Sequence, residues 1–206
     1  VDQTYESLLF LKKRSSEEKI RNLSLLHANL RELELPEKVF DIVLINGVLE
    51  WIPEVENIVV DEYWYGRGHR DSVSNPMKMQ KDFLKKVHTT LNVDGKVMLA
   101  IENRYDYKMF FGVRDPHVGL PFTTILPRFA ANFISKIIRS RPYLPWIYSF
   151  EDTKNLLLES GFSSVKLFSV WPDYRFPDHI TPYKSRNPYF KPISIRKDGK
   201  IQLKRL

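Results

Sequence analysis

Apolar side chains along the first half of the chain recur at two different spacings. Residues 4–14 place Tyr5, Leu8 and Leu9 on one helical face and end in three basic residues, which suits the dipole of a helix that begins at Thr4. Residues 77–91 carry an apolar side chain at every fourth position. Both patterns predict amphipathic helices.

Three short runs, at residues 23–28, 40–45 and 96–101, are mostly apolar and do not alternate between apolar and polar positions. Continuous apolar strands are typical of parallel sheets with both faces covered. Strand, helix and strand follow one another through short connections, such as the predicted turn at 92–95, and this order favours right-handed parallel crossovers. The pattern predicts an α/β fold of the Rossmann-like type, with a mainly parallel sheet flanked by helices.

The second half of the chain is less regular. Residues 129–138 and 151–160 predict two further helices, the second capped by Ser149. Residues 164–170 predict a strand, and the turn residues near 197–200 predict a final hairpin.

These elements indicate one domain over residues 1–180, followed by a basic tail or edge hairpin at 181–206. Within the domain, residues 52–76 form a polar, aromatic insertion, and residues 102–148 are the region where an acceptor substrate is expected. The length of 206 residues and the hydrophobic fraction of 43% suit a single sizeable core.

Composition narrows the function classes. The chain has no cysteine, which excludes disulfides and thiolate nucleophiles, and no apolar run long enough to span a bilayer. We therefore expect a cytoplasmic protein. The net charge of +7 favours anionic partners, and much of the excess lies in residues 184–206.

Polar residues follow each predicted strand at the edge where such sheets bind ligands. They are Asp2, Asn29 with Leu30, Asn46 with Gly47, and Glu102 with Asn103 and Arg104. A carboxylate after a strand can accept hydrogen bonds from both hydroxyls of a ribose, which makes Asp2 a candidate for nucleoside binding.

In order and spacing these residues resemble class I S-adenosylmethionine-dependent methyltransferases. Asp2 resembles the acid that holds the cofactor ribose, and Asn29 with Leu30 resembles the adenine-binding stretch, where the family has an acid in place of Asn29. Phe-Asp-Ile-Val at 40–43 resembles the fourth strand, and the loop at 46–52, which begins with Asn46 and Gly47, resembles the one that faces the methionine part. The resemblance implies S-adenosylmethionine as cofactor.

One element of the family pattern does not occur in the chain. The family's Gly-x-Gly loop should come before Val1, so we expect the first strand and helix of the fold to be missing here. Gly66 and Gly68 do not follow an apolar strand and do not replace it. The chain alone is therefore expected to bind the cofactor weakly, and a degenerate domain that binds a partner protein stays open as an alternative.

Residues 101–108 and 171–177 have a narrower resemblance, to bacterial methyltransferases that accompany polysaccharide and glycosyl-transfer machinery. That resemblance implies a small-molecule or glycan acceptor. Asn103, Arg104 and Lys108 are the candidate substrate-binding residues, because they supply donors for hydroxyl, phosphate or carboxylate groups.

An oxygen acceptor benefits from a base, and His117 is the first candidate because its ordinary pKa lies near neutrality. Glu102 is the second candidate catalytic residue. His117 could instead be a loop histidine bonded to backbone, and Glu102 could instead form a structural ion pair with Arg104. The histidines show no metal-ligand spacing, so we expect no metal.

The sequence thus predicts methyl transfer to a small molecule or glycan. An RNA methyltransferase stays open as an alternative, because aromatic residues are interleaved with lysine and arginine in the tail.

Overall fold

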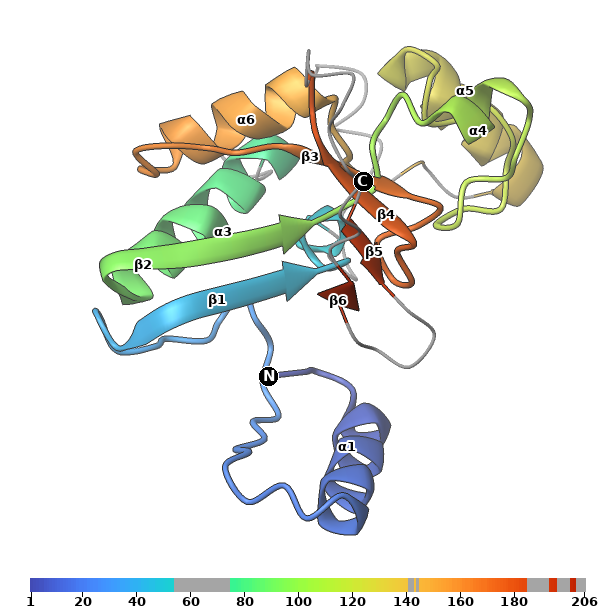
Figure 1. Ribbon diagram of the computed structural model, residues 1–206. Helices are drawn as coiled ribbons and strands as arrows, with labels where there is room; N and C mark the ends of the chain where they lie inside the picture. Colours follow the sequence, from blue (N-terminus) through green and yellow to red (C-terminus); the bar gives the residue numbers. More distant parts are fainter. Residues whose placement is uncertain (54–74, 141–142, 144, 185–192, 196–200, 203–206) are drawn as a thin grey trace.

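The computed structural model describes residues 1–53, 75–140, 143, 145–184, 193–195 and 201–202, which form a mixed α/β fold (Figure 1). The helices are α1 (Tyr5–Glu17), the 3-10 turn η1 (Leu49–Trp51), α3 (Pro76–Thr90), α4 (Tyr107–Phe110), α5 (Arg128–Arg139) and α6 (Phe150–Glu159). The strands are β1 (Phe40–Asn46), β2 (Leu91–Ala100), β3 (Phe168–Trp171), β4 (His179–Pro182), β5 (Ile193–Ile195) and β6 (Ile201–Gln202). Most of the predicted insertion, residues 54–74, lies outside the described residues.

The strands β1 and β2 pair in parallel, with α3 between them in the sequence, as predicted. Phe40 pairs with Leu91 and Ile42 with Lys96, so residues 92–95 bulge out between the two paired positions. Asp94 lies in this bulge with a φ of +64°. The predicted turn at 92–95 is therefore present, but it interrupts β2 instead of preceding it.

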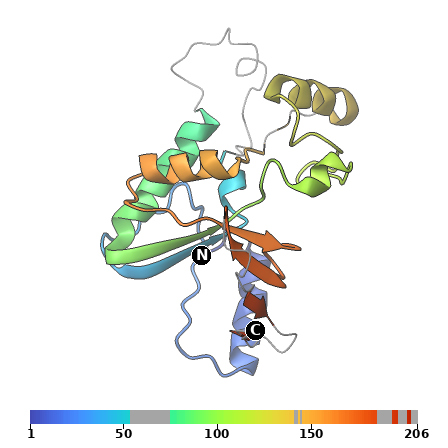
Figure 2. The same cartoon turned by 45° about the horizontal axis from the view of Figure 1, so that its top comes forward.

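Helices α3 and α6 lie together over one face of the β1–β2 pair (Figure 2). Their apolar faces form the main core with the inward side chains of the strands and with η1, and this core includes Ile45, Leu49, Leu84, Leu156 and Leu157. The opposite face is open within the described part of the chain. Its side chains Ile42, Leu44 and Met98 are more than half exposed. The prediction of flanking helices therefore holds for one face only.

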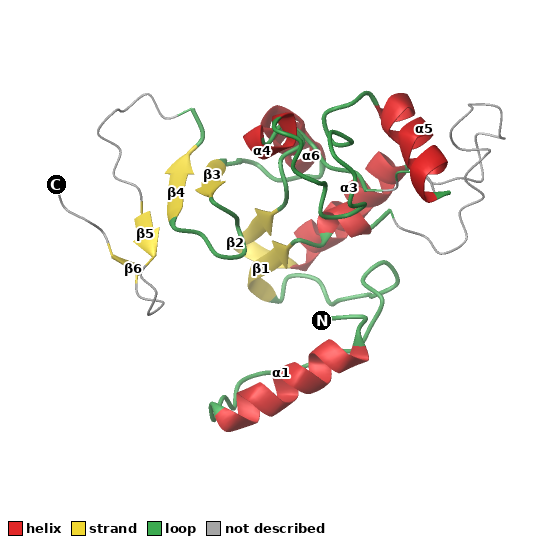
Figure 3. Cartoon of the chain, turned by 90° about the vertical axis from the view of Figure 1, so that its right-hand side faces the viewer, coloured by secondary structure: helices red, strands yellow, loops and turns green. Residues whose placement is uncertain are grey.

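The second sheet corrects the prediction of a mainly parallel fold. Strands β3, β4, β5 and β6 pair in sequence order, and every pairing in this sheet is antiparallel. Short connections suit antiparallel neighbours, whereas parallel neighbours need a crossover of about a dozen residues or more. The predicted final hairpin is confirmed by the β5–β6 pairing (Figure 3).

The N-terminal segment departs from its prediction. Residues 23–28 do not form a strand and make one isolated parallel bridge, between Asp2 and His27. Leu23 and Leu26 are exposed, so this segment does not gain the burial that would stabilise a strand. The predicted helix is present as α1, which lies apart from the sheet (Figures 1 and 3).

None of the helices in the described ranges is both long and apolar enough to cross a membrane.

Candidate active site

The strands β1 and β2 end side by side, and the residues that follow them form the candidate site. Asn46 pairs with Ala100, and the N–H of Gly47 donates to the Ala100 carbonyl at 2.9 Å. Gly47 has a φ of +63°, and a Cβ at this position would lie 2.7 Å from the Tyr174 hydroxyl. Glycine therefore allows a close turn against Tyr174, and this turn leads the chain into η1.

Three side chains from distant parts of the sequence meet just beyond this turn. Glu50 comes from η1, Glu102 follows β2, and His117 comes from the segment between α4 and α5. His117 Nε2 lies 3.8 Å from Glu50 Oε1 and 3.7 Å from Glu102 Oε2. The side chains of Glu50 and His117 are only 1% and 2% exposed. Together with Asp115 these residues are called the acid–histidine cluster.

Asp115 fixes the orientation of the imidazole. Its Oδ1 accepts from both the backbone N–H and the Nδ1 of His117, each at 2.8 Å. Its Oδ2 accepts from the Tyr143 hydroxyl at 2.7 Å and from the Thr123 hydroxyl at 3.2 Å. An ionised carboxylate only accepts, so Nδ1 carries the donated proton and Nε2 is the ring nitrogen that faces Glu50 and Glu102.

Glu102 is anchored through one of its two oxygens. Oε1 accepts from the Tyr174 hydroxyl at 3.0 Å and from the Arg175 guanidinium at 3.1 Å. Burial raises the pKa of Tyr174, so its hydroxyl keeps its proton and donates. Glu102 Oε2 and Glu50 Oε2 are buried and have no hydrogen-bond partner among the described residues. The cluster therefore presents carboxylate oxygens with free lone pairs beside an oriented imidazole.

The buried charges shift one another's proton affinities. Burial raises the pKa of Glu102, and the neighbouring charge of Glu50 raises it further. Burial acts to raise the pKa of Asp115, but hydrogen bonds from His117 and Tyr143 outweigh it and hold this pKa below its usual range. Burial acts to lower the pKa of His117, yet the bond to Asp115 and the surrounding carboxylates raise it to about 9. His117 therefore carries its proton at neutral pH in this arrangement, whereas the predicted base needs the proton-free form.

The three candidate substrate-binding residues hold the surrounding loops. Arg104 donates from Nε and from one terminal nitrogen to the carbonyls of Thr124 and Leu126, at 3.0 and 2.9 Å. Asn103 Oδ1 accepts from the N–H two residues on, and Lys108 Nζ donates to the Pro172 carbonyl at 2.5 Å. Arg175 is the arginine that pairs with Glu102, which the sequence did not predict.

The predicted cofactor-binding residues form two groups. Asp2 and Asn29 lie close together, because Asp2 bridges to His27 and the Ala28 N–H donates to the Asp2 carbonyl. This group lies on the β1 side of the parallel pair (Figure 1). Asn46 and Gly47 form the second group, at the acid–histidine cluster.

Local bonds hold the side chains of the first group. Asp2 Oδ1 accepts from the Thr4 N–H at 2.7 Å, and Asn29 Oδ1 accepts from the Arg31 N–H at 3.1 Å. Asn29 Nδ2 donates to Glu32 at 3.0 Å, and Leu30 packs against the main core. A carboxylate oxygen has two lone pairs, so these bonds leave acceptor capacity on Asp2.

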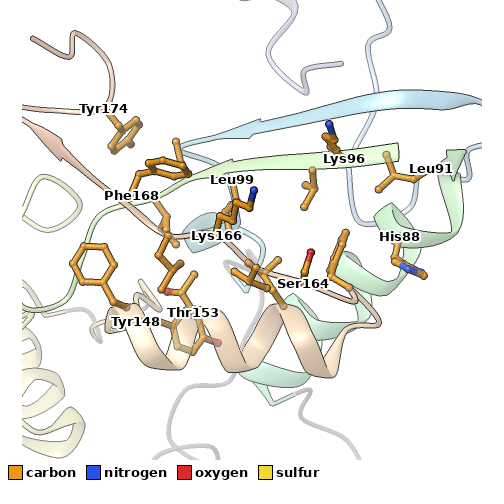
Figure 4. Close-up of a pocket in the computed structure, with 18 of the residues that line it drawn as sticks. His88, Leu91, Lys96, Leu99, Tyr148, Thr153, Ser164, Lys166, Phe168 and Tyr174 are labelled. Carbon is orange, nitrogen blue, oxygen red and sulfur yellow. The ribbon is translucent and has the colours of Figure 1, made fainter. Parts of the chain in front are cut away.

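A cavity of about 800 Å³ lies on the side of β2 that faces away from β1, between this strand, α6 and residues 162–174 (Figure 4). Its wall combines the rings of Tyr148 and Phe168 with the polar groups of Thr153 and Lys166. Glu102 lines it as well, so this one carboxylate belongs to both the cavity and the acid–histidine cluster.

Glu50 and Asp115 are the residues that sequence reasoning missed. Glu50 lies in the loop at 46–52 that the resemblance identifies, but no sequence pattern shows that η1 turns its side chain inward. Asp115 precedes His117 by two residues, a spacing at which a carboxylate can reach both the backbone and the ring of the histidine. That spacing is the signal that could have identified it.

The model of the methyltransferase domain family matches residues 1–62. No curated protein matches the chain. Among solved structures, a Nostoc punctiforme protein assigned as an O-methyltransferase matches with 18% identity and a TM-score of 0.43. The match covers 83% of this chain and 40% of the Nostoc chain, so this chain spans less than half the length of that protein.

Proposed function

We propose that the protein transfers a methyl group from S-adenosylmethionine to a hydroxyl group of a small-molecule or glycan acceptor. The observation that carries the proposal is the place of the acid–histidine cluster at the shared carboxyl end of β1 and β2. Parallel strands of α/β folds bind ligands beyond this end. The methyltransferase-domain match over residues 1–62 covers β1 and the loop that leads to Glu50.

The reaction is an in-line displacement at the sulfonium methyl group. The methyl carbon–sulfur bond breaks as the carbon–oxygen bond forms, which yields S-adenosylhomocysteine and a methyl ether, and the hydroxyl proton must leave the acceptor. Glu102 and His117 remain the proposed catalytic residues, with Glu102 Oε2, whose lone pair is free beside the imidazole, as the acceptor of this proton. The protein's main contribution is to orient the two substrates and to exclude water.

For the cofactor, we assign the ribose to Asp2, the adenine to Asn29 and Leu30, and the methionine part to Asn46 and Gly47. The closeness of Asp2 and Asn29 supports the first two assignments, since ribose and adenine are joined. The turn at Gly47 supports the third, because its backbone lies next to Glu50 and Glu102.

For the acceptor, we assign the cavity beside β2, which meets the acid–histidine cluster at Glu102. The wall combines aromatic rings with hydroxyl, amide and ammonium groups, and this combination suits a sugar, which has apolar faces and polar edges. Asn103, Arg104 and Lys108 would then shape this cavity through the loops that they hold.

The test uses the full-length protein and S-adenosylmethionine labelled in its methyl group, with oligosaccharides and RNA as separate acceptors. We expect label in the saccharide fraction, a loss of about 10²-fold or more in kcat for Glu102→Gln, and an unchanged rate for the matched exposed variant Glu151→Gln. Labelled RNA would favour the RNA alternative. S-adenosylmethionine binding without transfer to any acceptor would favour a binding domain.

A further inference from the structure

We propose that Glu50, Glu102 and His117 bind a divalent metal cation through one carboxylate oxygen each and the imidazole Nε2. One potential ligand atom from each residue lies within 4.8 Å of the others. The scattered histidine spacing predicted no metal, because two of these three ligands are carboxylates that are brought together only by the fold.

The distances suit ligands of one ion. Metal–nitrogen and metal–oxygen bonds of about 2.1 Å at a tetrahedral angle place two ligand atoms about 3.4 Å apart. Nε2 lies 3.8 Å from Glu50 Oε1 and 3.7 Å from Glu102 Oε2, so the two pairs that include the histidine need to close by only a few tenths of an ångström, and all three ligand atoms lie within 4.8 Å of one another.

Two buried oxygens give an independent reason for a ligand. Glu50 Oε2 and Glu102 Oε2 have no hydrogen-bond partner in the described ranges of the chain, although Glu50 is 1% exposed. A buried polar atom without a hydrogen-bond partner lowers the stability of the fold, and a buried charge without a partner lowers it more. A cation between the two carboxylates would bind Glu102 Oε2 directly and offset the buried charge of the Glu50 carboxylate.

The surrounding residues already provide the outer contacts of a metal site. Asp115 accepts the Nδ1 proton of His117 at 2.8 Å, which directs Nε2 toward the carboxylates, where a bound ion would take the place of the Nε2 proton. A carboxylate, a histidine and a metal in this order are a recurring arrangement that fixes the ring and strengthens it as a ligand. Tyr174 and Arg175 hold Glu102 through its other oxygen, which leaves Oε2 for the ion.

The charge balance also favours a dication. The cluster contains three carboxylates, of Glu50, Glu102 and Asp115, and the guanidinium of Arg175, a side chain that is 53% exposed, lies 3.1 Å from Glu102. When an ion replaces the proton on Nε2 and leaves the imidazole neutral, a dication brings the formal charge of these groups to zero. Two hard oxygen ligands with one imidazole suit Mn²⁺ or Zn²⁺ better than Mg²⁺, which seldom takes nitrogen ligands.

The binding site stands on this geometry alone, and only its use in catalysis rests on the proposed function. A cation with three protein ligands keeps positions open for oxygen ligands. With an ion bound, Glu102 and His117 would serve as its ligands instead of as proton acceptors, and such a position would hold the acceptor hydroxyl and lower its pKa, so that its proton passes more easily to water.

The test is a titration of chelator-treated full-length protein with MnCl₂, followed by the electron paramagnetic resonance signal of free Mn²⁺. We expect saturable binding of one Mn²⁺ per chain, with weaker binding of Mg²⁺. Glu50→Gln and Glu102→Gln should each weaken Mn²⁺ binding at least tenfold, and Asp115→Asn by about 10- to 100-fold. Glu151→Gln, an exposed carboxylate paired with Lys184, should leave it unchanged.

A pulsed resonance measurement on the wild type tests the histidine ligand without any variant. Bound Mn²⁺ should show modulation from an imidazole nitrogen. Absence of saturable binding up to about 1 mM, or bound Mn²⁺ without nitrogen modulation, would overturn the proposal. Mn²⁺ binding without methyl transfer would contradict the proposed function and leave the metal site standing. Methyl transfer in excess chelator, together with no Mn²⁺ binding, would contradict the metal site and leave the proposed function standing.

Discussion

Replacing Asp115 by asparagine perturbs the contact that orients the acid–histidine cluster. The carboxylate is 1% exposed and accepts from Tyr143, Thr123 and both the ring and the backbone of His117. An amide has one acceptor oxygen and one NH₂ group. With its oxygen toward His117 the amide places its NH₂ against the Tyr143 and Thr123 hydroxyls, which must then accept instead of donate, and with the opposite orientation the NH₂ faces the His117 N–H groups; in both cases the negative charge that these donors bond to is lost.

The expected loss follows from these bonds. Hydrogen bonds to a charged group contribute about 1.5–3 kcal/mol each, and breaking a buried charged network costs about 3–5 kcal/mol. We expect Asp115→Asn to lower the free energy of unfolding by about 3–5 kcal/mol, a large part of the 5–15 kcal/mol typical of a folded domain. Tyr143→Phe removes one donor and leaves the carboxylate its bonds to His117 and Thr123, so its cost should be about 1–2 kcal/mol.

The assay is urea unfolding in the presence of chelator, followed by circular dichroism. Asp41→Asn is the matched control, because the Asp41 carboxylate accepts from Asn92 at an exposed position and should change stability by less than about 0.5 kcal/mol. A stability of Asp115→Asn within about 1 kcal/mol of the wild type would refute the reasoning that this network holds the site.

Three further outcomes are expected. Gly47→Ala should destabilise the fold by about 2–3 kcal/mol in the same unfolding assay, because the added Cβ clashes with Tyr174 and the residue keeps a positive φ. Gly119→Ala has the same backbone strain but open space around it, so it should cost only about 1 kcal/mol. Asp2→Ala in the full-length protein should weaken S-adenosylmethionine binding by about 1–3 kcal/mol in calorimetry, and unchanged affinity would remove the ribose assignment. Replacing Arg186, Lys191, Lys197 and Lys200 by glutamine should leave methyl transfer to a saccharide unchanged, whereas a weaker and less salt-dependent RNA affinity would move the acceptor class to RNA.

Local patterns predicted most of the individual elements. The fourfold spacing at 77–91 and the β-branched run at 40–45 identified α3 and β1 within a residue or two, because each pattern reflects burial of one element against the core. The Ser149 cap of α6 is also present, with its hydroxyl accepting from the Asp152 N–H at 3.2 Å. These features depend on residues close together in the sequence.

Long-range pairing explains what the sequence did not predict. Residues 23–28 are as apolar as a buried strand but find a single bridging partner, and the strands after 167 pair antiparallel with one another instead of joining β2. Glu102 and His117 both lie in the acceptor region predicted at 102–148, and the fold brings them to 3.7 Å from each other. Their bonds to Arg175 and Asp115 depend on loop conformations, and the Tyr143 hydroxyl reaches Asp115 from 28 positions away in the sequence.

A crystal structure of the full-length protein with S-adenosylhomocysteine would test the central claim most directly. We predict that the ribose hydroxyls bind Asp2, that the adenine lies beside Asn29, and that the sulfur lies at the turn of Gly47, facing Glu102 and His117. A nucleoside seated away from Asp2 and Asn29, or a sulfur pointing away from the acid–histidine cluster, would contradict it.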